Sequence, residues 1–139
     1  MYKFLEHTAD LKFQATGATL EEAFAESARA MYSFIIDIKK IKPVIEKKIT
    51  IESENHEALL FDFLSEFLVF IDTKGFLLND VKSIKIQQTD KGFRLNASVV
   101  GDTINGKYET GGDIKAVTYN DMFIKKEGNQ WVIQVLCDI

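Results

Sequence analysis

The spacing of hydrophobic residues predicts an amphipathic helix near the start of the chain. Residues 20–35 carry apolar side chains at intervals of three and four, the period of one helix face. Thr19 directly precedes this stretch, and Glu22 lies three residues after Thr19. This spacing is the capping-box pattern typical of a helix N-terminus. We therefore expect the first helix to run from residue 19 to about residue 36.

A second helix is predicted after Asn55, whose side chain can cap it. Its apolar residues, from Leu59 to Ile71, form a wide face, which suits a helix packed against both a sheet and the first helix. Gly75 should end this helix, because glycine readily adopts the left-handed conformation of a helix C-terminus.

Alternating apolar and polar residues predict β-strands in the rest of the chain. The strand-like stretches are residues 2–5, 11–16, 48–53, 81–86, 93–99, 113–125 and 131–137. The polar, glycine-containing residues 89–92 should form a hairpin turn, and residues 101–112 a surface loop. We expect a single α+β domain over residues 1–139, with two helices packed on a mostly antiparallel or mixed sheet of about six strands.

Composition narrows the class of protein. Of the 139 residues, 46% are hydrophobic, which is typical of a globular domain. The net charge of −4 disfavours a surface that binds nucleic acid mainly through phosphates. Cys137 is the only cysteine, so an internal disulfide is impossible. The sequence shows no signal-peptide pattern and no apolar run of membrane-spanning length, so we expect a cytoplasmic protein without membrane contact.

Acidic residues near both ends of the chain form the main candidate site. Asp10 ends the polar motif EHTAD, and Asp138 precedes the last residue, Ile139. If the fold brings them together, the two side chains and the α-carboxylate of Ile139 form a cluster of hard oxygens, whose repulsion a divalent cation would relieve. Alternatively, Asp10 caps a turn and Asp138 is an ordinary polar residue at a frayed end.

Other chemistry has little support in the sequence. His7 and Cys137 would need to converge to ligate zinc or to form a nucleophile pair, and no CxxC or HxxxH pair accompanies them. Capping or exposure explains His56 at the start of the second helix. No Gly-x-Ser-x-Gly elbow, Walker motif or GxGxxG follows a strand. We therefore expect a protein with no catalytic residues.

Three separated motifs resemble the archease family: EHTAD, GGDIKAVTYNDM and the terminal pair Asp138-Ile139. The resemblance covers essentially the whole chain. Archeases are small single-domain protein cofactors of the GTP-dependent RNA ligase of the RtcB type, which joins tRNA halves. The resemblance implies that this chain promotes guanylylation and multiple turnover of that ligase, with tRNA contacted only through the ligase. It also implies a divalent-metal site made of Asp10, Asp138 and Ile139.

The ion expected in a structure of such a site is Ca²⁺, and Mg²⁺ or Mn²⁺ would also suit the oxygen ligands. One position departs from the family pattern. Histidine commonly follows AVTY, but this chain has Asn120, which retains a hydrogen-bonding group and lacks a titrating, metal-binding nitrogen.

Two other functions remain alternatives to ligase activation. One is a chaperone-like binding module, which would expose an apolar patch. The other is a small metal-dependent hydrolase, which the sequence disfavours because no general base stands beside the carboxylates. We expect a monomer or a weak oligomer.

Overall fold

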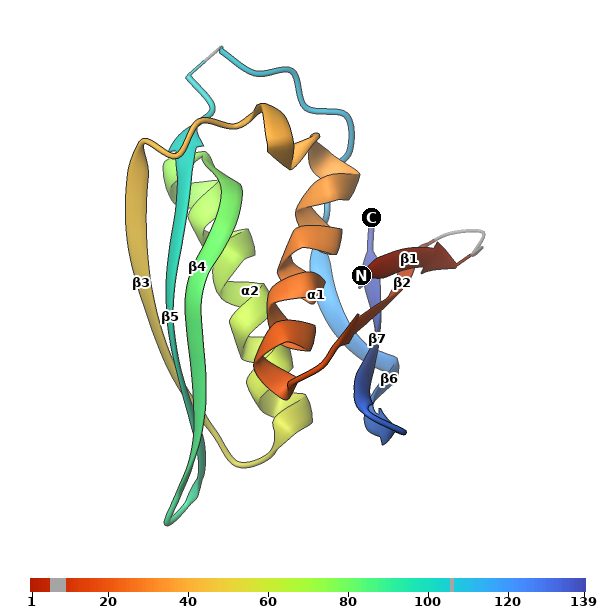
Figure 1. Ribbon diagram of the computed structural model, residues 1–139. Coiled ribbons are helices and arrows are strands. Elements are labelled where there is room, and N and C mark those ends of the chain that lie inside the picture. The colour runs from red at the N-terminus through yellow and green to blue at the C-terminus, as the bar shows by residue number, and fades with distance from the viewer. Residues whose placement is uncertain (6–9, 106) are drawn as a thin grey trace.

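The structure is a computed structural model that describes residues 1–5, 10–105 and 107–139 (Figure 1). The elements in chain order are β1 (Tyr2–Leu5), β2 (Asp10–Gly17), α1 (Leu20–Ile35), the short 3-10 helix η1 (Ile38–Lys40), β3 (Ile45–Ser53), α2 (His56–Lys74), β4 (Phe76–Thr89), β5 (Gly92–Thr103), β6 (Ala116–Glu127) and β7 (Gln130–Asp138). Within the described residues, neither α1 nor α2 is apolar enough over sufficient length to cross a bilayer.

Two antiparallel sheets enclose the helices (Figure 1). One sheet has the strand order β1-β2-β7-β6, and the other has the order β3-β5-β4. Helix α1 packs on β2 and β4, and α2 packs on β6 and β3, so the helices form the middle of three layers. The predicted α+β class is confirmed. The strands of the described residues number seven, close to the predicted six, but they form two sheets where a single sheet was predicted.

The ends of both helices confirm the sequence prediction. The Thr19 hydroxyl accepts a hydrogen bond of 3.1 Å from the backbone N–H of Glu22, and so caps α1. The Asn55 side chain accepts one of 2.8 Å from the N–H of Ala58, and so caps α2. Gly75 ends α2 with a left-handed backbone, φ 61°. These local preferences fix where each helix enters and leaves the middle layer.

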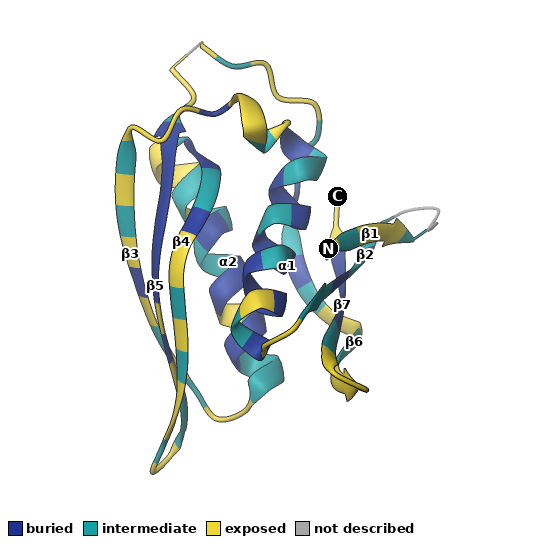
Figure 2. Ribbon diagram, in the orientation of Figure 1, coloured by how far each residue is buried: buried dark blue, intermediate teal, exposed yellow. Residues whose placement is uncertain are grey.

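The core fills the space between the helices and the inner faces of the two sheets (Figure 2). Its largest fully buried side chains are Tyr32, Phe13, Phe24, Phe63, Phe67 and Phe76. The Tyr32 hydroxyl donates a hydrogen bond of 3.0 Å to the carbonyl of Phe76, so this buried polar group is satisfied. Burial of each such side chain stabilises the fold by roughly 1.5–3 kcal/mol.

The loop predicted for residues 101–112 begins later than expected. Gly101 is buried within β5, where it pairs with Ile45 and Leu78. A Cβ atom at Gly101 would overlap the carbonyl oxygen of Leu77. Glycine is therefore needed here because two strands approach each other closely, and not because the chain turns. The connection from β5 to β6 starts after Thr103.

Candidate metal site

The fold brings Asp10 and Asp138 face to face. Strands β2 and β7 are antiparallel neighbours, and their register pairs Asp10, the first residue of β2, with Asp138, the last residue of β7. Directly opposed residues in such a pair project from the same face, with Cβ atoms about 4.5–5.5 Å apart. Two carboxylates at this separation can reach a common cation, since Ca²⁺ accepts oxygen ligands at about 2.3–2.6 Å.

The surrounding strands hold the end of β7 in place. Asp138 also faces Ala116 of β6, and its carbonyl accepts a hydrogen bond of 2.8 Å from the backbone N–H of Lys115. The alternative in which Asp138 lies at a frayed end therefore does not hold, because the backbone of Asp138 is paired on both sides. Its side chain is nevertheless exposed, as is that of Ile139, and Asp10 is half-buried.

The donor set at this edge consists of hard oxygens. Within residues 1–5, 10–105 and 107–139, no three side chains of His, Cys, Asp or Glu are grouped to hold a metal ion. A site here would thus combine two aspartates with main-chain oxygens, such as the α-carboxylate of Ile139, and with water. Such ligands suit Ca²⁺, Mg²⁺ or Mn²⁺ better than zinc.

The zinc or nucleophile role considered for Cys137 has little structural support. Its thiol is fully buried. Burial, and to a lesser extent the negative charge of Asp138, raises the pKa of the Cys137 thiol to about 12. A thiolate is the reactive form of a nucleophilic cysteine, so this thiol is unsuited to that role. Its suggested partner, His7, lies in residues 6–9, outside the described residues.

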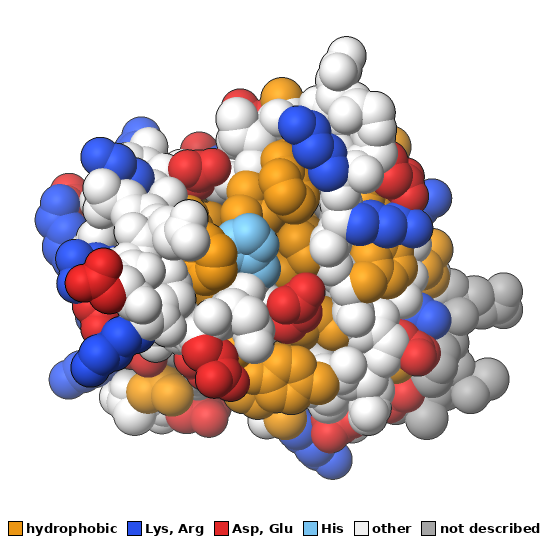
Figure 3. All heavy atoms as spheres, turned by 90° about the horizontal axis from the view of Figure 1, so that it is seen from below, with side chains coloured by type: hydrophobic (Ala, Val, Ile, Leu, Met, Phe, Trp, Pro, Cys, Tyr) orange, Lys and Arg blue, Asp and Glu red, His pale blue; other side chains and the backbone are white. Residues whose placement is uncertain are grey.

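His56 packs in an aromatic cluster. It begins α2, and its ring lies 4.2 Å from that of Phe93 and edge-on to Trp131 at 6.3 Å. Figure 3 shows a histidine surrounded by hydrophobic side chains, with acidic side chains near them. Aromatic packing, and not the predicted capping or exposure, therefore accounts for this residue.

Strand β6 contains a bulge that the sequence analysis missed. The register with β7 shifts between Thr118 and Phe123, and Asp121 has a left-handed backbone with φ 57°. The bulge presents Tyr119, which is 54% exposed and stacked on Phe61 of α2 with 4.4 Å between ring centroids. The sequence carries a trace of this bulge, because Asn and Asp tolerate left-handed conformations better than other non-glycine residues.

A chain of polar contacts supports this bulge. The Gln134 side chain is buried and donates a hydrogen bond of 2.8 Å to the carbonyl of Asp121. It also accepts one of 2.9 Å from the side chain of Gln14. The ammonium group of Lys12 lies 3.3 Å from the Asp121 carboxylate. Strands β2 and β7 therefore fix the bulge as well as the opposed aspartates.

Asn120 lies at the tip of this bulge. Its side chain is exposed, and its backbone N–H donates a hydrogen bond of 3.2 Å to the Thr118 hydroxyl. That hydroxyl donates one of 2.8 Å to the carbonyl of Leu136. Thr118 therefore has a structural role in pairing β6 with β7.

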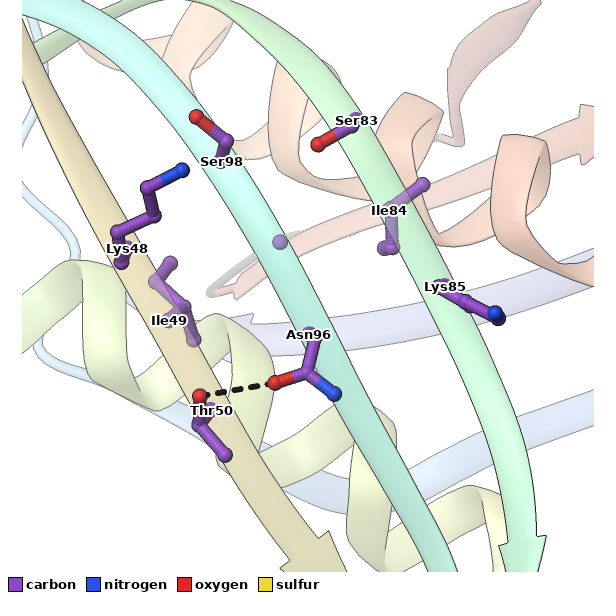
Figure 4. A pocket seen from close by; sticks show the side chains of 9 residues that line it. Lys48, Ile49, Thr50, Ser83, Ile84, Lys85, Asn96 and Ser98 are labelled. Atoms are coloured by element: carbon purple, nitrogen blue, oxygen red, sulfur yellow. Dashed lines mark hydrogen bonds between the residues drawn. The ribbon is translucent and has the colours of Figure 1, made fainter.

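A shallow hollow lies on the outer face of the other sheet (Figure 4). Its volume is about 330 Å³, and its polar lining residues are Lys48, Thr50, Ser83, Lys85, Asn96 and Ser98. Thr50 donates a hydrogen bond of 3.0 Å to Asn96, and Lys48 pairs with Glu46 at 3.1 Å. Three of these six polar side chains therefore already have partners on the sheet surface. The hollow belongs to a different sheet from the opposed aspartates and adds nothing to their site.

Comparison with known proteins places these features in a family. Residues 2–139 match the model of the Archease protein family (MTH1598/TM1083). The protein archease of Thermococcus kodakarensis is 37% identical over 140 residues, which cover 99% of this chain and 98% of the relative. The protein archease of Methanosarcina barkeri is 38% identical over 141 residues, which cover 99% and 95%.

Two solved structures are similar to this fold. The solution structure of Methanobacterium thermoautotrophicum protein 1598 has a TM-score of 0.87 and 32% identity, with 99% of this chain and 98% of that chain covered. A crystal structure of an archease from Thermotoga maritima, described as a possible chaperone, has a TM-score of 0.63 and 23% identity, with 100% and 98% covered. The second similarity concerns the fold alone.

Proposed function

Because this chain belongs to the archease family, we propose that it is a non-catalytic activator of the GTP-dependent RNA ligase of the RtcB type. It promotes guanylylation of the ligase and its multiple turnover, and it meets tRNA only through the ligase. The observation that carries this proposal is the pairing of Asp10 with Asp138 where β2 and β7, the two central strands of the four-stranded sheet, meet at one end.

In this proposal the paired edge holds a divalent cation. Asp10, Asp138 and the α-carboxylate of Ile139 are its ligands, and Ca²⁺, Mg²⁺ and Mn²⁺ are the candidates because all three prefer oxygen donors. A cation held there would supply positive charge for contact with anionic groups of the ligase complex. Without compensation, two like charges directly opposite one another in a sheet repel.

The sheet keeps the two carboxylates in register. Leu11 and Cys137, the neighbours of the aspartates along their strands, form the next cross-strand pair and are both buried. A slip of one residue would expose this pair, so the register is strongly fixed. The edge is therefore a preformed surface, and ligand atoms on such a surface lose little conformational entropy on binding.

A ligation assay tests this function. We expect Asp10→Ala and Asp138→Ala to abolish stimulation of a purified ligase of this type under multiple-turnover conditions. Asp90→Ala, at the exposed tip of the β4–β5 hairpin, is the matched control and should stimulate as the wild type does. Circular dichroism checks that every variant is folded. Full stimulation by both folded edge variants would overturn the proposal.

A chaperone-like module is the second candidate, because the Thermotoga maritima archease is described as a possible chaperone and Tyr119 is an exposed aromatic side chain. A C-terminal extension distinguishes the two functions. Addition of residues after Ile139 removes its α-carboxylate from the proposed site and should weaken metal binding and ligase stimulation. A general chaperone would keep its activity on unrelated unfolded proteins.

A further inference from the structure

A second surface combines one exposed and one half-buried aromatic ring with carboxylates. We call it the aromatic-acidic surface, and it is made of Glu54 in the β3–α2 connection, Phe61 and Asp62 of α2, and Tyr119 of the β6 bulge. It belongs to the N-terminal half of α2, and Figure 3 shows that hydrophobic and acidic side chains adjoin on the lower face of the molecule.

The exposed ring of Tyr119 is held in one orientation. It stacks on Phe61 with an interplanar angle of 6°, so one of its faces is covered. The side chain is still 54% exposed, which leaves its other side accessible to a ligand. A β-bulge commonly redirects a side chain away from the sheet, and here the buried Gln134 holds the bulge by its hydrogen bond to the Asp121 carbonyl.

Negative charge adjoins this ring. Asp62 and Glu54 are both exposed, and the Asp62 carboxylate accepts a hydrogen bond of 2.7 Å from the Ser53 hydroxyl. Burial, and then the charges of Asp62 and Glu54, raise the pKa of the Tyr119 hydroxyl. Neither carboxylate has a Lys or Arg partner in the part of the chain that the structure describes.

We propose that the aromatic-acidic surface binds an arginine side chain of a protein partner. The face of an aromatic ring attracts a cation, and a planar guanidinium can stack on the ring while its N–H groups reach a carboxylate. Arginine suits this site better than lysine, because the guanidinium is planar and more weakly hydrated than an ammonium group.

Charge and sequence argue against two other occupants. The carboxylates repel the phosphates of a nucleic acid. A second copy of this chain has only Arg29 and Arg94 to offer. Arg29 is paired with Glu26 and Asp80, and Arg94 is paired with Glu52. The proposal therefore assigns the arginine to another protein.

Nuclear magnetic resonance titration of the full chain tests this proposal. The probes are the peptide acetyl-Gly-Arg-Gly-amide and the same peptide with lysine or with uncharged citrulline in the central position. With the arginine peptide we expect saturable chemical-shift changes at residues 54, 61, 62 and 119. The lysine peptide should bind more weakly. The citrulline peptide should cause no specific chemical-shift changes. Tyr119→Ala and Asp62→Asn should each weaken binding of the arginine peptide about two- to fivefold.

Matched variants keep the result independent of the ligase assay. Tyr119→Phe retains the ring and should bind the arginine peptide as the wild type does, as should Asp90→Asn at the exposed β4–β5 hairpin tip. Equal shifts with citrulline, equal affinity for lysine, or unchanged affinity in both Tyr119→Ala and Asp62→Asn would overturn the proposal. Chemical-shift changes at these residues that depend on protein concentration without peptide would also overturn it, because they would assign the surface to a second copy of the chain. Chemical-shift changes there on addition of an oligouridylate would overturn it as well, because they would assign the surface to RNA.

Discussion

Asp10 and Asp138 face each other across β2 and β7, although they lie near opposite ends of the chain. Two sheet neighbours of like charge normally destabilise a fold. A divalent cation between them would turn this repulsion into attraction, and it would bind the folded state only.

Metal should therefore stabilise the protein in a way that depends on this pair. At a Ca²⁺ or Mn²⁺ concentration of about 100 times Kd, binding stabilises the folded state by about 2.7 kcal/mol. For a domain of this size, that corresponds to a Tm increase of roughly 5–10 °C. We expect the increase in wild type and in Asp90→Asn, and not in Asp138→Asn, by thermal unfolding with added metal and with a chelator. An equal increase in Asp138→Asn would refute the site.

A second prediction concerns two glycines. A Cβ at Gly101 would overlap the carbonyl oxygen of Leu77, whereas at Gly111 the nearest atom is the Ile35 carbonyl oxygen at 3.8 Å. Gly101→Ala should therefore lower the free energy of unfolding by about 1–3 kcal/mol, the usual cost of overpacking. Gly111→Ala should change it by less than about 0.5 kcal/mol. Urea denaturation measures both values, and equal effects would show that the strands separate at no cost.

Gly101 also illustrates what the sequence could predict. Helix ends depend on neighbouring residues, so the caps at Thr19 and Asn55 were predictable. The sequence alone, however, does not distinguish a glycine in a loop from a glycine at a close contact between two strands. Likewise, alternation shows that a strand has one buried face, but it does not show which sheet the strand joins. The division into two sheets depends on contacts that are distant in sequence, and it could not be predicted.

The candidate site shows the same division between local and distant information. Asp10 and Asp138 could be named as candidates because carboxylates near the two ends are visible in the sequence. Their pairing depends on the register of β2 with β7, which only the folded structure gives. The bulge at Asp121 was missed because residues 113–125 read as one continuous strand, and the supporting Gln134 lies on another strand.

Asp102 predicts a dependence of stability on pH. Its carboxylate accepts hydrogen bonds from the backbone N–H of Thr103 at 2.8 Å and from the Tyr108 hydroxyl at 2.9 Å. These hydrogen bonds lower the pKa of Asp102 below its ordinary value of 3.8, and the bond from Thr103 has the larger effect. The pKa is then lower in the folded state, so the carboxylate stabilises the protein above pH 3.8 and loses this effect as the pH falls through the folded-state pKa.

Asp102→Asn should thus lower the urea midpoint at pH 7, and the difference from wild type should shrink at pH values below 3.8. The measurement is urea denaturation followed by fluorescence at several pH values. Asp90→Asn, at the exposed hairpin tip, is the control and should show a smaller difference at pH 7. A difference for Asp102→Asn that stays constant from pH 7 to pH 3 would contradict the role of these hydrogen bonds.

The last prediction tests the support of the β6 bulge. Gln134 is buried and bonds both to the Asp121 carbonyl and to Gln14, so Gln134→Met would leave two polar groups without these partners while changing the side-chain volume little. The cost should be about 1–3 kcal/mol in the free energy of unfolding. Gln130→Met, on the same strand and exposed, should cost less than about 0.5 kcal/mol. Urea denaturation measures both, and equal costs would mean that the bulge keeps its shape without Gln134.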